Sequence, residues 1–280
     1  MLSNEIFPPA LRMFSQTIMY AIGFILMMVV SLRTCKRHGI SKRDAFLFTL
    51  VSYYGGVAGA VFMGEQFTRV SLKYGGGDSK VAIFGAVIFV PFYIIGAALL
   101  SGKPWRKVMD LMAPGGFIIL TCAKFGCFLV GCCPGLECEF GLYDHFYKKV
   151  MFPSQIFEAF SMCFVVAFCF WYGLKYKKRI PGKAYPFTII LYSIVRFGWE
   201  FIRYYDVEEM RNLFLGLTFW QLWCIVTFIG GIAWLVIMSW SRLPEFEEKF
   251  YIKRAEVVEM IKEKLPLKNK ANEGSSEQGA

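Results

Sequence analysis

Charged residues are scarce in this chain of 280 residues. They make up 19% of the sequence, whereas a typical soluble domain carries about 25%. Hydrophobic residues reach 56%, and the mean hydropathy is +0.46. This balance excludes a soluble enzyme, a nucleic-acid-binding module and a secreted domain held together by disulfides. The composition predicts an integral membrane protein.

Histidine is almost absent, with only His38 and His145 in the whole sequence. Two histidines are too few for a site built from several imidazoles. The sequence also lacks the G-x-S-x-G motif of serine hydrolases, the Walker loop and the Rossmann glycine pattern. We therefore expect no metal and no cofactor.

Seven apolar runs are long enough to cross the hydrocarbon of a bilayer. They are continuous, whereas the strands of a membrane barrel would alternate apolar and polar residues. The sequence thus predicts an all-α integral membrane protein with seven transmembrane helices. Basic residues follow the first run, which we interpret as a spanning helix rather than a cleaved signal peptide, so we expect Met1 to be retained. The runs are Phe14–Leu32, Ala45–Met63, Val81–Leu100, Ala113–Cys133, Ser154–Leu174, Ala184–Ile202 and Leu213–Ser239.

Lysine and arginine are distributed unevenly between the loops. One alternate set of loops, together with the C-terminal tail, holds 21 of them, and the other set holds eight. By the positive-inside rule, the N-terminus is predicted to lie outside and the C-terminus in the cytoplasm. We expect a seven-helix membrane domain over 1–241, a charged cytoplasmic helix over 242–266 and a disordered tail over 267–280.

Four ionisable residues fall within predicted spans: Lys124, Glu158, Arg196 and Glu200. Each costs roughly 2.5–3.5 kcal/mol in a membrane, which makes it a candidate for function. Arg196 and Glu200 are four residues apart and share a helix face with Tyr192 and Arg203. We predict that the four charges line a polar cavity open to the outer leaflet. Its cations would hold a phospholipid phosphate, and a carboxylate would act as base.

Four of the nine cysteines form a C-x4-C-C-x4-C pattern: Cys127, Cys132, Cys133 and Cys138. This spacing matches none of the usual zinc or iron-sulfur motifs. On one continuous helix, Cys127 and Cys132 would point in different directions. The glycines around Pro134 are expected to end the helix near the outer interface. A disulfide among the last three cysteines stays open, because it depends on the redox environment.

Four segments resemble motifs of the prolipoprotein diacylglyceryl transferase family, in the same order and with similar spacing, between about Met19 and Trp240. The family signature G-R-x-G-N-F…N-G-E…G is similar to the stretch from Lys124 to Gly135. Its H-P-S-Q-x-Y-E-A motif is similar to the stretch from Phe152 to Ala159. Its Y-x-x-x-R-F-x-x-E-F-x-R motif is similar to the stretch from Tyr192 to Arg203, and a family glutamine matches Gln221, which follows Leu217 and Thr218.

The resemblance implies an enzyme of the bacterial plasma membrane. Such an enzyme moves a diacylglyceryl group from phosphatidylglycerol to the lipobox cysteine of a preprolipoprotein, and glycerol phosphate leaves. It implies catalytic roles for Arg196, Glu200, Lys124 and Glu158. The implied substrate-binding residues are Tyr192, Gln155, Arg203, Cys127, Cys132, Gly126 and Gly135.

The chain also departs from the family motifs. Lys124 replaces the signature arginine, and an ammonium lacks the two-pronged fork of a guanidinium. Cys127 and Cys132 replace an asparagine and a glutamate, and Phe152 replaces a histidine. The expected H-G-G motif reads Ser79-Lys80-Val81-Ala82.

Two alternatives to the transferase stay open. One is a lipid-binding or assembly subunit without catalytic activity on the same fold. The other is a thiol-based membrane enzyme that uses the cysteine cluster. A transporter is disfavoured, because the spans show no paired halves.

Overall fold

The computed structural model describes residues 9–73, 82–144, 147–175, 180–205, 215–240 and 243–264. It divides into two units, Met1–Val236 and Ile237–Ala280. The described elements are the helices α2 (Pro9–Thr34), α3 (Lys42–Lys73), α4 (Ile83–Ser101), α5 (Trp105–Val130), α6 (Ser154–Phe170), α7 (Ala184–Glu200), α9 (Phe219–Ser239) and α10 (Leu243–Lys264), the short helices η1 (Cys35–His38) and η2 (Trp171–Lys175), and the strands β1 (Glu137–Asp144) and β2 (Lys149–Met151).

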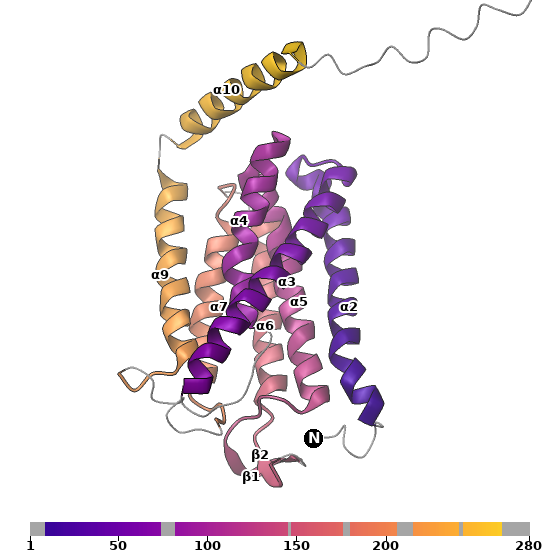
Figure 1. Cartoon of the computed structure of the whole chain (residues 1–280), viewed down its shortest axis with the longest axis vertical. Coiled ribbons are helices and arrows are strands. Elements are labelled where there is room, and N and C mark those ends of the chain that lie inside the picture. Colours follow the sequence, from indigo (N-terminus) through magenta and orange to yellow (C-terminus); the bar gives the residue numbers. More distant parts are fainter. Residues whose placement is uncertain are drawn as a thin grey trace, which may run out of the picture. The chain divides into compact units, whose positions relative to one another are not determined.

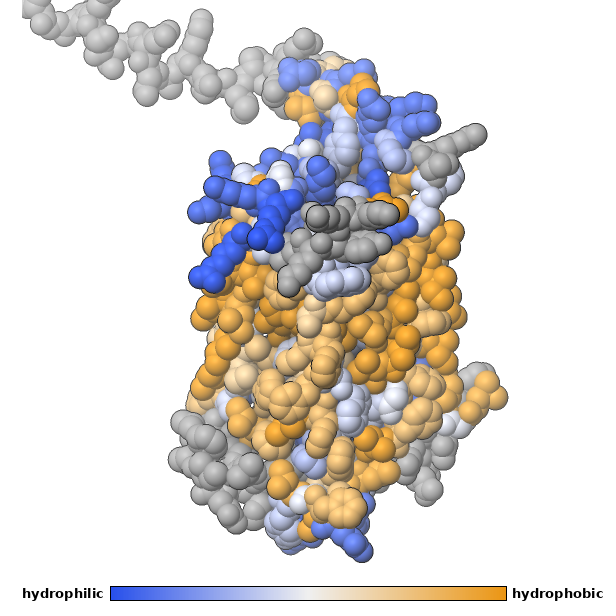
Figure 2. Space-filling view, turned by 180° about the vertical axis from the view of Figure 1, so that it is seen from behind, coloured by the Kyte–Doolittle hydropathy of each residue, from blue (hydrophilic) through white to orange (hydrophobic). Residues whose placement is uncertain are grey.

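Six of the described helices are long and apolar enough to span a membrane: α2, α3, α4, α5, α6 and α9. Hydrophobic side chains cover the middle of the helix bundle (Figure 2). Many of them are exposed, such as Phe92 and Phe164, as expected for a surface that lipid covers. The chain is a multi-pass membrane protein. The sixth predicted span, Ala184–Ile202, corresponds to α7, which has 17 residues and is not among these six.

The predicted and observed boundaries differ where a helix continues beyond its apolar run. The run Ala45–Met63 lies inside the longer α3, and α5 begins eight residues before the predicted Ala113. Hydropathy marks the part of a helix that lies in hydrocarbon, whereas backbone hydrogen bonds continue into the polar ends. The sequence did not predict the antiparallel hairpin of β1 and β2, which adds a small sheet to an otherwise helical chain.

Helix α5 is the centre of the larger unit. It packs against α2, α3, α4, α6 and α7, and 67% of its spanning window is buried, against 22–44% for the other five candidate spans. Small residues permit this packing. A Cβ on Gly126 would lie 3.3 Å from the Cα of Gln16 in α2, so α2 and α5 pack closely there.

The hairpin lies at the end of the bundle where α5 ends and α6 begins (Figure 1). Backbone hydrogen bonds join the segment after α5 to the segment after α7: Leu136 N–H donates to the Ile202 carbonyl at 2.9 Å, and Tyr204 N–H donates to the Pro134 carbonyl at 3.0 Å. Gly135 lies between them, and a Cβ there would be 2.9 Å from the Ile202 oxygen and 3.0 Å from the Phe152 Cβ. Only glycine fits without a shift of the backbone.

The smaller unit contains α10, a charged helix with exposed apolar side chains such as Phe246 and Ile252. Its cytoplasmic position stays a prediction. The predicted disordered tail, 267–280, lies outside the described residues.

Candidate active site

The four charged residues predicted to lie together do so, and they come from three helices. The Lys124 ammonium of α5 lies 2.7 Å from Oε1 of Glu158 in α6, and the same oxygen lies 3.3 Å from Nε of Arg196 in α7. Nη2 of Arg196 is 2.5 Å from Oε2 of Glu200. All four side chains are buried, with exposed fractions of 2–6%. Burial without partners would be costly for each charge, so the ion pairs explain how the sequence tolerates them.

Glu200 also joins the cluster to the start of α9. Its Oε1 accepts hydrogen bonds from the Tyr205 hydroxyl and, at 3.1 Å, from the Thr218 hydroxyl. Thr218 and Gln221 form a capping box: the Gln221 N–H donates to Thr218 Oγ1, and the Thr218 N–H donates to Gln221 Oε1. The sequence prediction named neither Tyr205 nor the capping role, although a threonine three residues before a glutamine is a readable helix-start signal.

Arg203 supplies a third cation at the edge of the cluster. Its backbone pairs with Gly135 in an isolated β-bridge. Burial alone would lower the pKa of Arg203, but its neighbours, Cys133 first and then Glu200 and Glu158, raise it well above its usual value. Arg203 is therefore charged at any physiological pH.

The charges of the cluster do not balance. With the Cys133 thiol protonated, Lys124, Arg196 and Arg203 carry three positive charges against the two carboxylates, which leaves one in excess. Among the described residues, Nη1 of Arg196 and Nε2 of Gln221 are buried donors without a hydrogen-bond partner. Buried donors are normally paired. The cluster is thus suited to a singly charged anion with oxygen acceptors.

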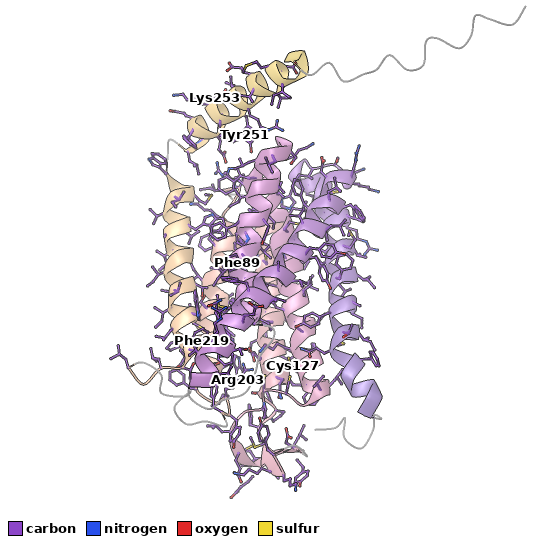
Figure 3. The ribbon with its side chains drawn as sticks, in the orientation of Figure 1. Phe89, Cys127, Arg203, Phe219, Tyr251 and Lys253 are labelled. Atoms are coloured by element: carbon purple, nitrogen blue, oxygen red, sulfur yellow. The ribbon has the colours of Figure 1, made fainter. Side chains whose placement is uncertain are left out.

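The start of α6 is tied to the cysteine segment. Nε2 of Gln155 donates to the Cys132 carbonyl at 2.7 Å, and the Ser154 hydroxyl donates to the Cys133 carbonyl at 3.3 Å. Glu158 follows one turn later on the same helix. The structure therefore places the predicted Gln155 and Cys132 next to each other and close to the ion pairs. Figure 3 labels Cys127 and Arg203 toward the hairpin end of the bundle.

Other predicted site residues contact different parts of the fold. Tyr192 is 2% exposed, and its ring lies 5.8 Å from those of Phe84 and Phe117. Gly126 faces α2 rather than the ion pairs, and Gly135 holds the segment after α5 against that after α7. Contact of these three residues with substrate stays a prediction.

The departures from the expected motifs have structural consequences. The Phe152 ring, at the place of a histidine, stacks on Phe157 with ring centres 5.1 Å apart, and Phe157 stacks on Trp199. An aromatic stack thus takes the place of an imidazole. The stretch Ser79–Val81, where a second histidine was expected, lies outside the described residues.

Fold and site together define a class: a multi-pass membrane protein with a buried, net positive charge cluster at one end of its helix bundle. Comparison with known proteins identifies the family. The model of the family "Prolipoprotein diacylglyceryl transferase" matches residues 5–237. The chain belongs to the prolipoprotein diacylglyceryl transferase family.

Individual relatives support this assignment. The chain is 28% identical over 262 residues to phosphatidylglycerol–prolipoprotein diacylglyceryl transferase 2 of Clostridium perfringens. The matched region covers 88% of this chain and 98% of that protein. It is 23% identical over 214 residues to the corresponding transferase of Clostridium tetani, covering 69% and 82%. A transferase of Ehrlichia ruminantium is 37% identical over 103 residues, covering 36% and 37%.

Proposed function

We propose that this protein transfers a diacylglyceryl group from phosphatidylglycerol to the lipobox cysteine thiol of a preprolipoprotein. The excess positive charge of the buried cluster carries the proposal. A phosphodiester has one negative charge and several acceptor oxygens, and it would both neutralise the cluster and pair Nη1 of Arg196. The names of the relatives supply the two substrates.

The cations act on the leaving group. The acceptor sulfur forms a bond to the glyceryl carbon, the bond from that carbon to the phosphate oxygen breaks, and negative charge grows on the departing glycerol phosphate. Arg196 and Lys124 stabilise this charge in a site from which water is largely excluded. Lys124 acts as a point charge, because its ammonium cannot grip two phosphate oxygens as a guanidinium can.

The acceptor thiol must also lose its proton. Glu200 has both oxygens engaged, Oε2 by Arg196 and Oε1 by Tyr205 and Thr218. Both ion pairs of Glu158 are made through Oε1. We therefore assign Glu158 the role of general base and Glu200 that of orienting Arg196.

The membrane arrangement follows from the same proposal. We propose that α7 also crosses the membrane, which would bring the number of spans to seven, and that the hairpin end of the bundle faces the outside of a bacterial plasma membrane. The basic loops at the opposite end, including Arg33, Lys36 and Arg37, support this orientation. Phosphatidylglycerol and the acceptor peptide would reach the cluster from the outer leaflet.

A reconstituted assay tests the proposal. The purified protein is incubated with phosphatidylglycerol and a lipobox peptide, and mass spectrometry detects the thioether-linked diacylglyceryl peptide. A peptide with serine in place of the cysteine and a reaction with phosphatidylcholine are the controls. We expect product only when the cysteine peptide and phosphatidylglycerol are present together. Absence of product from the folded protein would refute the proposed transferase activity.

One observation favours a lipid-binding subunit as the second candidate: Phe152, at the place of a family histidine, forms an aromatic stack with Phe157. The same preparation separates the two functions. A subunit of this kind would retain phosphatidylglycerol through purification in an Arg196-dependent manner and yield no lipidated peptide.

A further inference from the structure

Two glutamine side chains of the site have orientations that their backbone partners fix. Nε2 of Gln155 donates to the Cys132 carbonyl at 2.7 Å. A backbone carbonyl only accepts hydrogen bonds, so the amide of Gln155 turns its NH2 group to that carbonyl and its Oε1 elsewhere. Gln221 is oriented by the opposite contact, because its Oε1 accepts the Thr218 N–H at 3.0 Å and its Nε2 remains as a donor. Neither amide can be flipped without losing its hydrogen bond.

The atoms that remain form a pattern of donors and acceptors. Gln155 is 1% exposed, and its Oε1 is a buried acceptor without a hydrogen-bond partner among the described residues. Nη1 of Arg196 and Nε2 of Gln221 are buried donors in the same situation. Such atoms are costly unless something pairs them. A ligand that complements the site therefore offers oxygen acceptors to the two donors and a hydrogen-bond donor to Gln155.

A phosphodiester alone does not supply that donor. Its oxygens only accept hydrogen bonds, so they suit Arg196 and Gln221 and leave Gln155 unpaired. Gln155 precedes Glu158 by three residues on α6, which places the two side chains on one face, about 5–6 Å apart. Glu158 in turn lies 3.3 Å from Nε of Arg196. The required donor thus belongs about one helical turn from the phosphate, a distance that the alcohol esterified to that phosphate can span.

We propose that Gln155 selects the phospholipid headgroup, with its Oε1 accepting a hydrogen bond from a headgroup hydroxyl. The inference rests on the transfer proposed above, in which this headgroup leaves together with the phosphate. Among anionic phospholipids, a headgroup with a hydroxyl, such as glycerol, is preferred over an apolar headgroup of the same length. Zwitterionic lipids are disfavoured for a different reason, because their cationic headgroup would lie close to Lys124 and Arg196.

Phosphatidylpropanol is the probe that isolates the hydroxyl. It has the charge of phosphatidylglycerol and a headgroup of three carbons, but that headgroup has no hydroxyl. The full-length protein in detergent is given an equimolar mixture of the two lipids with the same acyl chains, and native mass spectrometry measures the ratio of the bound lipids. The wild-type protein should prefer phosphatidylglycerol by about 10- to 100-fold, because phosphatidylpropanol leaves a buried acceptor unpaired. Equal binding of the two lipids would overturn the proposal.

Two variants separate Gln155 from the groups that hold the phosphate. Gln155→Met keeps the length of the side chain but has no amide oxygen, so it should bind the two lipids equally. Gln221→Glu is the matched control, because it keeps the oxygen that caps α9 and loses the Nε2 donor. It should weaken the binding of both lipids to the same extent and retain the preference, since both lipids contain the phosphate. A folded Gln155→Met protein that still prefers phosphatidylglycerol would contradict the assignment.

The wild-type protein alone answers the question if Gln155→Met does not fold. Phosphatidyl-1,2-propanediol and phosphatidyl-1,3-propanediol each have one of the two hydroxyls, and at least one of them should bind as phosphatidylglycerol does. If both bind as weakly as phosphatidylpropanol, the single hydrogen bond to Gln155 is refuted.

Transfer to the lipobox peptide distinguishes this inference from the proposed function. In the wild-type protein, kcat/KM should be lower for phosphatidylpropanol than for phosphatidylglycerol by the same factor as binding. Equal transfer from both lipids would support the transferase and overturn the role of Gln155. No transfer from either lipid would refute the transferase, and the ratio of the bound lipids would still decide the role of Gln155. If Gln155→Met changes only the KM for the peptide, its Oε1 serves the acceptor peptide and the proposal is wrong.

Discussion

Replacement of Arg196 by lysine separates charge from geometry at the centre of the cluster. The guanidinium bridges two carboxylates, with Nε 3.3 Å from Glu158 and Nη2 2.5 Å from Glu200, and its Nη1 is left for substrate. A lysine ammonium keeps the positive charge but cannot reach all three partners. It retains one contact and loses at least one charge-assisted hydrogen bond, each of which contributes about 1.5–3 kcal/mol.

The expected effect follows from that energy. Since about 1.4 kcal/mol corresponds to a factor of ten, Arg196→Lys should lower kcat/KM for diacylglyceryl transfer by about 10- to 100-fold. The rate is measured by mass spectrometry of the lipidated peptide at several phosphatidylglycerol concentrations. Gel filtration in detergent verifies that the variant is folded.

The matched control is Arg106→Lys. This arginine donates from Nε to the Pro181 carbonyl at 3.0 Å, near the start of α5 and α7 and far along both helices from Lys124 and Arg196. The same chemical change there should leave the rate unaltered. A folded Arg196→Lys protein with a rate within threefold of the parent would refute the bridging role of the guanidinium.

Three further substitutions test other parts of the site. Gly135→Ala should abolish transfer or folding, because its Cβ would lie 2.9 Å from the Ile202 oxygen. Gly116→Ala, with open space around its Cβ, should change neither activity nor thermal unfolding appreciably. Equal behaviour of the two variants would contradict the steric argument. Thr218→Val removes the helix cap and the hydrogen bond to Glu200. It should lower the free energy of unfolding by about 0.5–2 kcal/mol and also lower the rate of transfer. An unchanged denaturation midpoint would argue against the capping role of Thr218. Lys124→Arg should raise the transfer rate with phosphatidylglycerol, because a guanidinium offers phosphate two parallel bonds; an unchanged or lower rate would indicate that the site is adapted to a different headgroup.

The helices were largely predictable because the thickness of the bilayer limits what a spanning sequence can be. An apolar run of about 20 residues has to be helical in hydrocarbon, where every backbone group needs a partner. The hairpin lies outside this constraint. Its strand Glu137–Asp144 includes Gly141 and a break in register between Glu137 and Leu142, so it lacks the regular alternation by which strands are recognised.

The members of the charge cluster were predictable, but their pairing was not. The cost of burying a charge marks Lys124, Glu158, Arg196 and Glu200 in the sequence. One oxygen of Glu158 pairs with two cations from different helices. This pairing depends on how α5, α6 and α7 pack, which the sequence pattern does not show. Tyr205 could not be found in this way, because it lies beyond the end of α7 and is not in a predicted span.

The end of α5 shows how a helix stop sets the positions of residues that are distant in the sequence. Had α5 continued to Cys133, as the apolar run suggested, Cys127 and Cys132 would lie on different faces of the helix. The left-handed Gly131 ends the helix three residues earlier. The same turn presents the carbonyls of Cys132 and Cys133 to Gln155 and Ser154. Since those two residues begin the helix that carries Glu158, the position of the proposed base depends on the turn that ends α5.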